Sequence, residues 1–121
     1  NSLLEENHIY DTYCNLIMKE ADNGMNQVLV NRPVLEEYIR RQYPGFKLIS
    51  STTKRITGLD GLLEELNKDY FLVVLDYDLN HNEEVLSAIG KQADKEEILV
   101  NEICYPGCPK RSEHYRQQSQ M

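Results

Sequence analysis

The stretch FLVVLD at positions 71–76 decides the fold, because five consecutive apolar residues end there at a carboxylate. Five residues are too few for a stable helix, and the run lacks the polar alternation of a half-exposed strand. Such a run is typical of a strand that is buried on both faces of a parallel sheet. Similar, mostly apolar runs lie at positions 27–30, 46–49 and 98–100. Successive run centres are 19, 25 and 26 residues apart, and these distances suit strand–helix–strand crossovers.

Amphipathic segments separate these runs and supply the helices. Residues 5–22 carry apolar side chains at steps of three and four, which predicts a helix with Cys14 on its inner stripe. The whole predicted stripe is Ile9, Tyr10, Tyr13, Cys14, Ile17 and Ala21. Asn31 is expected to cap a second helix, and Thr57 to precede a third. A fourth helix is predicted to begin at one of three residues, Asp78, Asn80 or Asn82.

The sequence therefore predicts an α/β fold, a four-stranded parallel sheet with crossover helices that resembles half of a TIM-type barrel. A complete eight-stranded barrel needs about 250 residues, and this chain has 121. We assign residues 1–109 to a single α/β domain and residues 110–121 to a polar C-terminal segment. That segment is interpreted as a frayed helix, a tail, or a segment that packs on another chain. Because the chain opens on a crossover helix without its strand, we expect it to be a piece of a larger barrel.

The charge balance argues against two classes of partner. Thirteen Lys and Arg against 20 Asp and Glu give a formal net charge of −7, whereas nucleic acids and anionic membrane surfaces attract basic proteins. No apolar run approaches the roughly 18–20 residues of a membrane span. We therefore expect neither a nucleic-acid nor a membrane partner. Three cysteines, an odd and small number, favour a reducing cytoplasm over a secreted disulfide scaffold.

The edges of the predicted sheet indicate a further copy of the chain as a partner. An open four-stranded sheet has two unpaired edge strands, which proteins usually cover or pair. We therefore expect a homodimer, formed through the sheet edges or through the C-terminal segment.

Polar residues follow each predicted strand, namely Asn31, Ser51, Asp76 and Asn101. In parallel α/β folds, ligand sites gather at the carboxyl ends of the strands. We therefore expect these four side chains to line a rim that binds a small molecule or a peptide. The same residue types also cap helices, so a purely structural role remains the alternative. Asp76 and Asp78 are candidate catalytic residues, because a carboxylate can act as a base and a pair can hold a magnesium ion.

Cys104 and Cys108 form the sharpest local motif. Three residues separate them, including a proline and a glycine, so a turn can bring both sulfurs to face one point. The two basic residues that follow would lower the pKa of these thiols, and thiolates are ligands for zinc and for iron–sulfur clusters. A closed zinc site has four ligands, for which His114 and Cys14 are the remaining candidates. A redox disulfide and a structural loop are the alternatives.

Residues 99–111, with His114 beyond them, resemble a group of uncharacterised bacterial proteins that is similar to the collagenase-like peptidase family. Residues 48–53 and 73–80 also fit that group. The resemblance implies a barrel-like α/β fold and a peptide or other small organic substrate. Some ubiquinone-hydroxylation accessory proteins of the wider family hold a four-iron cluster on four cysteines, which would make Cys104 and Cys108 two cluster ligands. This chain has only three cysteines, so one copy lacks a full cysteine set.

Three functional hypotheses follow from the sequence. The first is a barrel-like module that binds or acts on a substrate at the carboxyl rim. The second is a metal- or iron–sulfur-binding accessory protein that uses Cys104 and Cys108. The third is a non-catalytic assembly module. The sequence alone leaves open whether the protein is an enzyme.

Overall fold

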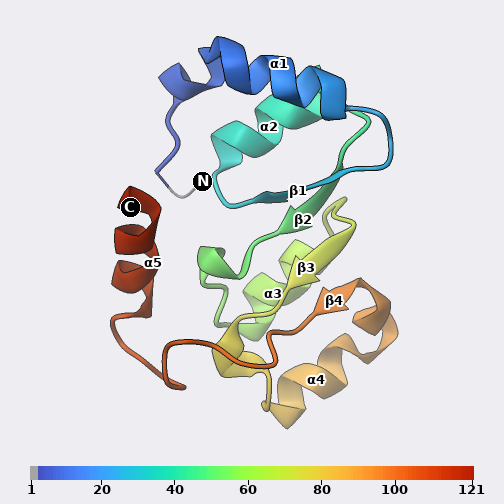
Figure 1. Cartoon of the computed structure of the whole chain (residues 1–121). Coiled ribbons are helices and arrows are strands. Elements are labelled where there is room, and N and C mark those ends of the chain that lie inside the picture. The colour runs from blue at the N-terminus through green and yellow to red at the C-terminus, as the bar shows by residue number, and fades with distance from the viewer. Residues whose placement is uncertain (1–2) are drawn as a thin grey trace.

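A four-stranded, all-parallel sheet lies at the centre of the computed structural model, which describes residues 3–121 (Figure 1). The strands are β1 (Gln27–Val30), β2 (Lys47–Ser50), β3 (Leu72–Val74) and β4 (Glu96–Glu97). Their order in the sheet is the order in the chain, and each neighbouring pair is parallel. The predicted α/β class and parallel sheet are therefore confirmed.

Helices connect successive strands, and one further α-helix lies before β1 and another after β4. The α-helices are α1 (Thr12–Ala21), α2 (Pro33–Gln42), α3 (Leu59–Leu66), α4 (Glu83–Ile89) and α5 (Arg111–Gln120). Short 3-10 segments are η1 (Glu6–Tyr10), η2 (Thr52–Lys54), η3 (Tyr77–Leu79) and η4 (Gly90–Lys95). Because right-handed crossovers between sequential parallel strands stay on one side, α2, α3 and α4 cover the same face of the sheet. This one-sided helix layer is consistent with half of a TIM-type barrel.

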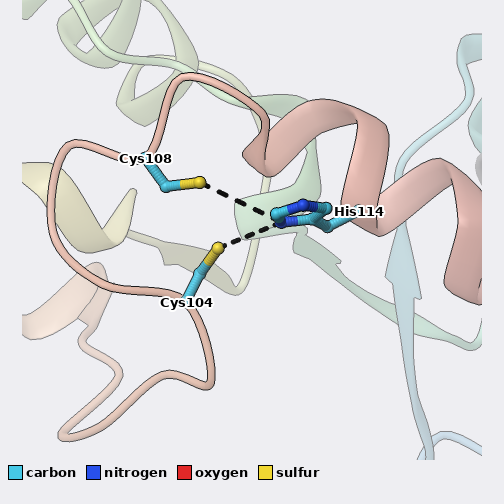
Figure 2. A group of neighbouring side chains, drawn as sticks. All are labelled: Cys104, Cys108 and His114. Carbon is cyan, nitrogen blue, oxygen red and sulfur yellow. Dashed lines mark hydrogen bonds between the residues drawn. The ribbon is translucent and has the colours of Figure 1, made fainter.

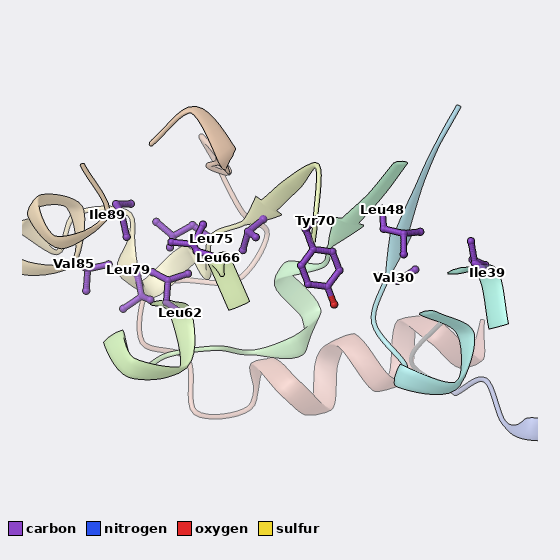
Figure 3. Close-up of a cluster of buried hydrophobic side chains, with 11 residues drawn as sticks. Val30, Ile39, Leu48, Leu62, Leu66, Tyr70, Leu75, Leu79, Val85 and Ile89 are labelled. Carbon is purple, nitrogen blue, oxygen red and sulfur yellow. The ribbon is translucent and has the colours of Figure 1, made fainter. Parts of the chain in front are cut away.

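The hydrophobic core lies between the sheet and this helix layer (Figure 3). The strand register places Val30, Ser50 and Val73 side by side on the covered face. Buried side chains from α2, α3 and α4 complete the core, namely Ile39, Leu62, Leu66, Val85 and Ile89. The opposite face is less covered, since the side chain of Leu29 is 49% exposed. In a closed barrel that face would point inward.

The fourth strand differs from the prediction. The apolar residues 98–100 are not its strand, because β4 is Glu96–Glu97, and Ile98 and Val100 are 52% and 91% exposed. The reason is the length of its neighbour. β3 ends at Val74, because the Asp76 side chain accepts a hydrogen bond from the Asp78 N–H and begins η3. Residues after Glu97 therefore have no strand to pair with.

The N-terminal helix also differs from the prediction. Instead of one helix over residues 5–22, Asp11 separates η1 from α1 and caps α1 by accepting a hydrogen bond from the Cys14 N–H at 2.7 Å. The predicted inner stripe is largely exposed, with Tyr13 at 80% and Ile17 at 67%. Cys14 is exposed as well, so its predicted core position is wrong.

A polar contact explains why α1 is rotated relative to the prediction. The hydroxyl groups of Tyr38 and Tyr43 both donate to the side-chain oxygen of Asn15. Met18, one turn later on α1, packs against the core. The face of α1 that carries Asn15 and Met18 therefore contacts the rest of the molecule, and the more apolar face points to solvent.

The predicted helix starts are right in part. Asn82 begins α4, since its side chain accepts a hydrogen bond from the Val85 N–H at 3.1 Å. Asn31 does not cap α2, because that helix begins at Pro33 and Arg32 occupies the N-cap. Thr57 precedes the third helix as expected, and this helix begins at Leu59 with Gly58 at its N-cap. Within residues 3–121, no helix has the length and apolar character needed to cross a bilayer.

Candidate metal centre

Hydrogen bonds join the carboxyl ends of the first three strands. The Asn31 side-chain amide donates to the Thr53 hydroxyl at 2.8 Å, and the Ser51 and Thr53 hydroxyls lie 2.7 Å apart. The Thr52 hydroxyl donates to the Leu75 carbonyl at 3.1 Å, which links the end of β2 to the end of β3. The structure thus brings Asn31 and Ser51 together. Asn101 lies exposed in the loop after β4.

Asp76 and Asp78, at the end of β3, face two guanidinium groups. Arg55 Nη1 lies 2.7 Å from Asp76 Oδ2, and Arg55 Nη2 lies 3.3 Å from Asp78 Oδ2. Arg111 Nη1 lies 2.9 Å from Asp78 Oδ1. Burial acts to raise the pKa of Asp78, but the Gly107 N–H and the two guanidinium groups hold that pKa below its usual value. Asp78 is therefore a carboxylate at neutral pH.

Arg55 reaches these carboxylates from a strained backbone. Its φ of 57° is left-handed, and among residues 3–121 no other residue except glycine has a positive φ. A non-glycine residue in this region costs on the order of 1 kcal/mol or more. The ion pairs with Asp76 and Asp78 offset this cost, so the conformation of Arg55 belongs to the site.

Cys104, Cys108 and His114 converge beside this ion-pair network (Figure 2). Cys104 Sγ lies 3.1 Å from His114 Nδ1, and Cys108 Sγ lies 4.0 Å from the same nitrogen. All three potential ligand atoms lie within 4.8 Å of one another. Cys108 is buried, whereas Cys104 and His114 are half-buried. Cys14, the fourth candidate from the sequence, lies exposed on α1 and outside this cluster.

A tight turn and a helix start produce this convergence. The Cys108 N–H donates to the Tyr105 carbonyl at 3.3 Å, and Gly107 within the turn has a φ of 71°. Glycine adopts this left-handed conformation without steric cost. α5 begins directly after the turn, and its backbone returns His114 toward the two sulfurs.

The two thiols differ in acidity. Burial acts to raise the pKa of Cys108, but hydrogen bonds from the Cys104 thiol, the Lys110 N–H and the Tyr105 hydroxyl, with the charge of Arg111, hold it below the usual value. The pKa of Cys104 is raised, first because its thiol hydrogen-bonds to Cys108. Cys108 is therefore the thiol that ionises first.

The separations of the donor atoms bracket those of a single tetrahedral zinc site. Bonds of about 2.3 Å to sulfur and 2.1 Å to nitrogen place tetrahedral ligand atoms roughly 3.5–3.8 Å apart, and the distances here are 3.1 and 4.0 Å from His114. Thiolate and imidazole are ligands that zinc prefers. If all three atoms bound one zinc ion, the protein would supply three ligands, the number that is usual in catalytic zinc sites.

Sequence reasoning missed the two arginines of the site. Arg111 is one of the two basic residues that the sequence predicts to lower the pKa of the thiols, yet its side chain is fully buried. The signal available was the pair Asp76 and Asp78 at a strand end, since buried carboxylates require cationic partners. No sequence signal identified Arg55, because its role depends on a left-handed backbone that glycine usually adopts.

Comparison with known proteins gives one distant similarity. Over 106 residues, the chain is 27% identical to a protein of Methanocaldococcus jannaschii named as an uncharacterized protease. The matched region covers 86% of this chain and 31% of that protein, so the chain spans about a third of its length. No protein-family model matches the chain. No solved structure matches it either.

Proposed function

We propose that the chain is a barrel-type α/β module that binds one zinc-type divalent ion at the carboxyl rim of its sheet. Cys104, Cys108 and His114 are the proposed ligands. The observation that carries the proposal is the convergence of their three donor atoms, from a loop and a helix, within 4.8 Å.

Charge supports a divalent ion. The formal charges of the two arginines and the two aspartates in the neighbouring network cancel, so two thiolates at the ligand positions would need a further cation. A dication would neutralise them. When bound with an open position, zinc lowers the pKa of a water ligand or polarises a carbonyl.

The spacing of the ligand atoms favours one ion over an iron–sulfur cluster. Each cysteine of a four-iron cluster binds a separate iron, so the sulfurs around such a cluster lie farther apart than the ligands of a single ion. A cluster would also need ligands beyond Cys104 and Cys108. The visible spectrum of protein purified without oxygen separates these cases, since zinc protein is colourless and cluster protein is brown.

The test is metal binding by the whole chain. We expect one zinc ion per chain by elemental analysis, and a thiolate-to-metal charge-transfer band when Co²⁺ is added to the metal-free protein. Replacement of Cys104 or Cys108 by serine should abolish that band. C14S is the matched control and should leave it unchanged, because Cys14 is exposed and outside the cluster. Protein that takes up neither ion, with Cys104 and Cys108 alkylated equally fast with and without Zn²⁺, would contradict the proposal.

A peptide is the proposed substrate class at this rim. The similarity to a protein named as a protease favours it, as does the resemblance of residues 99–111 to the collagenase-like peptidase family. In this proposal Asn31, Ser51 and Asn101 contact the peptide, and Asp76 and Asp78 shape the site. We expect zinc-loaded protein to cleave an unstructured protein such as casein, and chelation to stop cleavage. Cleavage that persists unchanged in both C104S and C108S would rule out this reaction at the metal centre.

A homodimer is the corresponding proposal for assembly. The edge strands β1 and β4 and the thinly covered face that carries Leu29 support it. Light scattering across a dilution series measures the mass, and a monomeric mass at every concentration would contradict it.

A further inference from the structure

Arg111 is an unusual residue to find without solvent contact. Its side chain is fully buried, although it begins a polar helix. Burial of a guanidinium group is costly unless an opposite charge lies close to it. Here Nη1 lies 2.9 Å from Asp78 Oδ1, Nη2 donates to the Tyr105 carbonyl at 2.6 Å, and the guanidinium carbon lies 5.3 Å from the centre of the Tyr77 ring.

Asp78 makes a second contact with the same loop. Its Oδ1 accepts a hydrogen bond from the Gly107 N–H at 2.7 Å. The segment between the two cysteines is therefore held at two points, the Tyr105 carbonyl through Arg111 and the Gly107 amide through Asp78. Both contacts lie within the three residues that separate Cys104 from Cys108.

The same arginine also fixes the helix that carries His114. Arg111 is the first residue of α5, and His114 follows three residues later on the same helix. α5 is otherwise polar, and its other contacts include the Tyr115 hydroxyl, which donates to Glu102 at 2.9 Å. One buried side chain thus connects the cysteine loop, the histidine helix and the end of β3.

Further contacts near the end of β3 hold Asp78 in place. Asp78 lies in η3, directly after β3, and Arg55 binds both Asp78 and the buried Asp76. Movement of Asp78 would therefore break contacts with Arg55 as well as with Arg111.

We propose that Asp78 and Arg111 are positioning residues of the metal centre, which hold Cys104, Cys108 and His114 in ligand geometry before the ion binds. This inference rests on the proposed function. Outer contacts that orient metal ligands are typically worth 10- to 100-fold in affinity. We expect an effect of that size although neither residue is itself a proposed ligand.

The experiment is Co²⁺ and Zn²⁺ titration of the metal-free chain and its D78N and R111K variants. D78N keeps an oxygen that can accept from the Gly107 N–H but loses the charge that pairs with Arg111. R111K keeps the charge but cannot reach Asp78 and the Tyr105 carbonyl with one planar group. Each variant should bind at least about 10-fold more weakly, with a shifted Co²⁺ absorption spectrum, because the ligands are less well placed. The matched controls are D69N, which changes a fully exposed aspartate, and R116K on the exposed side of α5.

The outcomes separate the two proposals. If the wild-type chain binds neither ion, the proposed function itself is wrong. If the wild type binds while D78N and R111K match it in affinity and Co²⁺ spectrum, the positioning role is overturned and the metal site stands. If R111K loses the circular dichroism of the folded chain, the metal affinity of the D78N variant alone tests the positioning role. Weaker binding with a shifted spectrum in folded D78N, and unchanged binding in D69N, is the supporting result.

Discussion

Two buried charge networks lie at the carboxyl side of the sheet, and they differ in what they hold. Around β2, Glu65 accepts hydrogen bonds from the Ser50 hydroxyl at 2.6 Å, from Lys54, and from Lys68 at 2.8 Å. This first network connects β2, η2 and α3, and it reaches Glu36 of α2 through the Tyr70 hydroxyl. The second network, after β3, ties the distant residue Arg111 to Asp78. The first network stabilises the fold, whereas the second shapes a loop that carries candidate ligands.

The two networks differ in the partners of their charged side chains. The Tyr70 hydroxyl donates to Glu36 and also accepts from Lys54 at 2.8 Å, so the first network is satisfied within itself. In the second network, backbone groups of the cysteine loop are partners of the charged side chains. Changes in the first network should therefore alter stability, and changes in the second should alter metal affinity.

The largest expected effect comes from breaking the first network. E65Q should lower the free energy of unfolding by about 3 kcal/mol, because it removes the charge that compensates the largely buried Lys54. Urea denaturation measures the change. E64Q, at the exposed neighbouring position on α3, is the control and should stay within about 0.5 kcal/mol of wild type. Equal effects of the two substitutions would mean that the first network is not structural.

The same glutamate predicts a pH dependence. Burial acts to raise the pKa of Glu65, but Lys54, Lys68 and Ser50 lower it from 4.5 to about 2. A lowered pKa in the folded state stabilises the protein fully above the unfolded value, and this contribution is lost as pH falls from about 4.5 toward 2. The acid-induced loss of stability in this window should be smaller in E65Q, as urea midpoints at several pH values would reveal.

The second network should show its effect through the metal. Zinc at about 100 times its Kd should raise the free energy of unfolding of the wild-type chain by about 2.7 kcal/mol, because the ion binds the folded state. The C108S variant should gain little from zinc, and C14S should gain as much as wild type. Thermal unfolding with zinc and with a chelator measures the difference. An identical zinc-induced stabilisation of C108S and wild type would contradict a metal-binding role for the loop that the second network holds.

Glu96, which belongs to neither network, predicts a pH dependence of the opposite sign. Both oxygens of its carboxyl group are buried without a hydrogen-bond partner, and this burial raises its pKa from 4.5 to about 7. The folded state therefore favours the protonated form, and stability should decrease as pH rises from about 4.5 through 7. E96Q should be more stable than wild type at pH 8 and less sensitive to pH, as urea denaturation at pH 5 and pH 8 would measure. The exposed E97Q should retain the wild-type pH dependence.

The smallest effect is expected at the surface. Arg40 Nη1 lies 3.7 Å from Asp69 Oδ2, and the Asp69 side chain is fully exposed. Exposed ion pairs contribute at most about 1 kcal/mol and often nothing measurable. D69N should therefore leave the urea midpoint nearly unchanged, and a large loss of stability would require a contact that the structure does not contain.

Local patterns predicted most of the sheet and part of the site. The strands around Leu29, Leu48 and Val73 were recognisable as short continuous apolar runs, although the face that carries Leu29 is exposed in this chain. The proline and glycine between Cys104 and Cys108 indicated a turn, and the structure contains that turn.

Features that depend on distant partners were not predictable from those patterns. The orientation of α1 is set by hydrogen bonds from the Tyr38 and Tyr43 hydroxyls to the Asn15 side chain. These polar contacts override the preference of the apolar stripe for the interior. The burial of Arg111 depends on Asp78, which lies 33 residues earlier in the chain. The position of β4 depends on where β3 ends, and the apolar run at 98–100 carries no information about that end.

The exposed position of Cys14 bears on how the protein is handled at the bench. Its thiol is exposed on α1, so air oxidation can join two molecules through an intermolecular disulfide. The hydrogen bond from this thiol to Asp11 raises its pKa, which slows that reaction at neutral pH, whereas alkaline buffer speeds it by forming the thiolate. A covalently crosslinked species would mimic a native oligomer in a size measurement. The mass of the protein should therefore be measured on the C14S variant. In the unaltered chain, the same thiol offers an attachment point for a fluorescent dye.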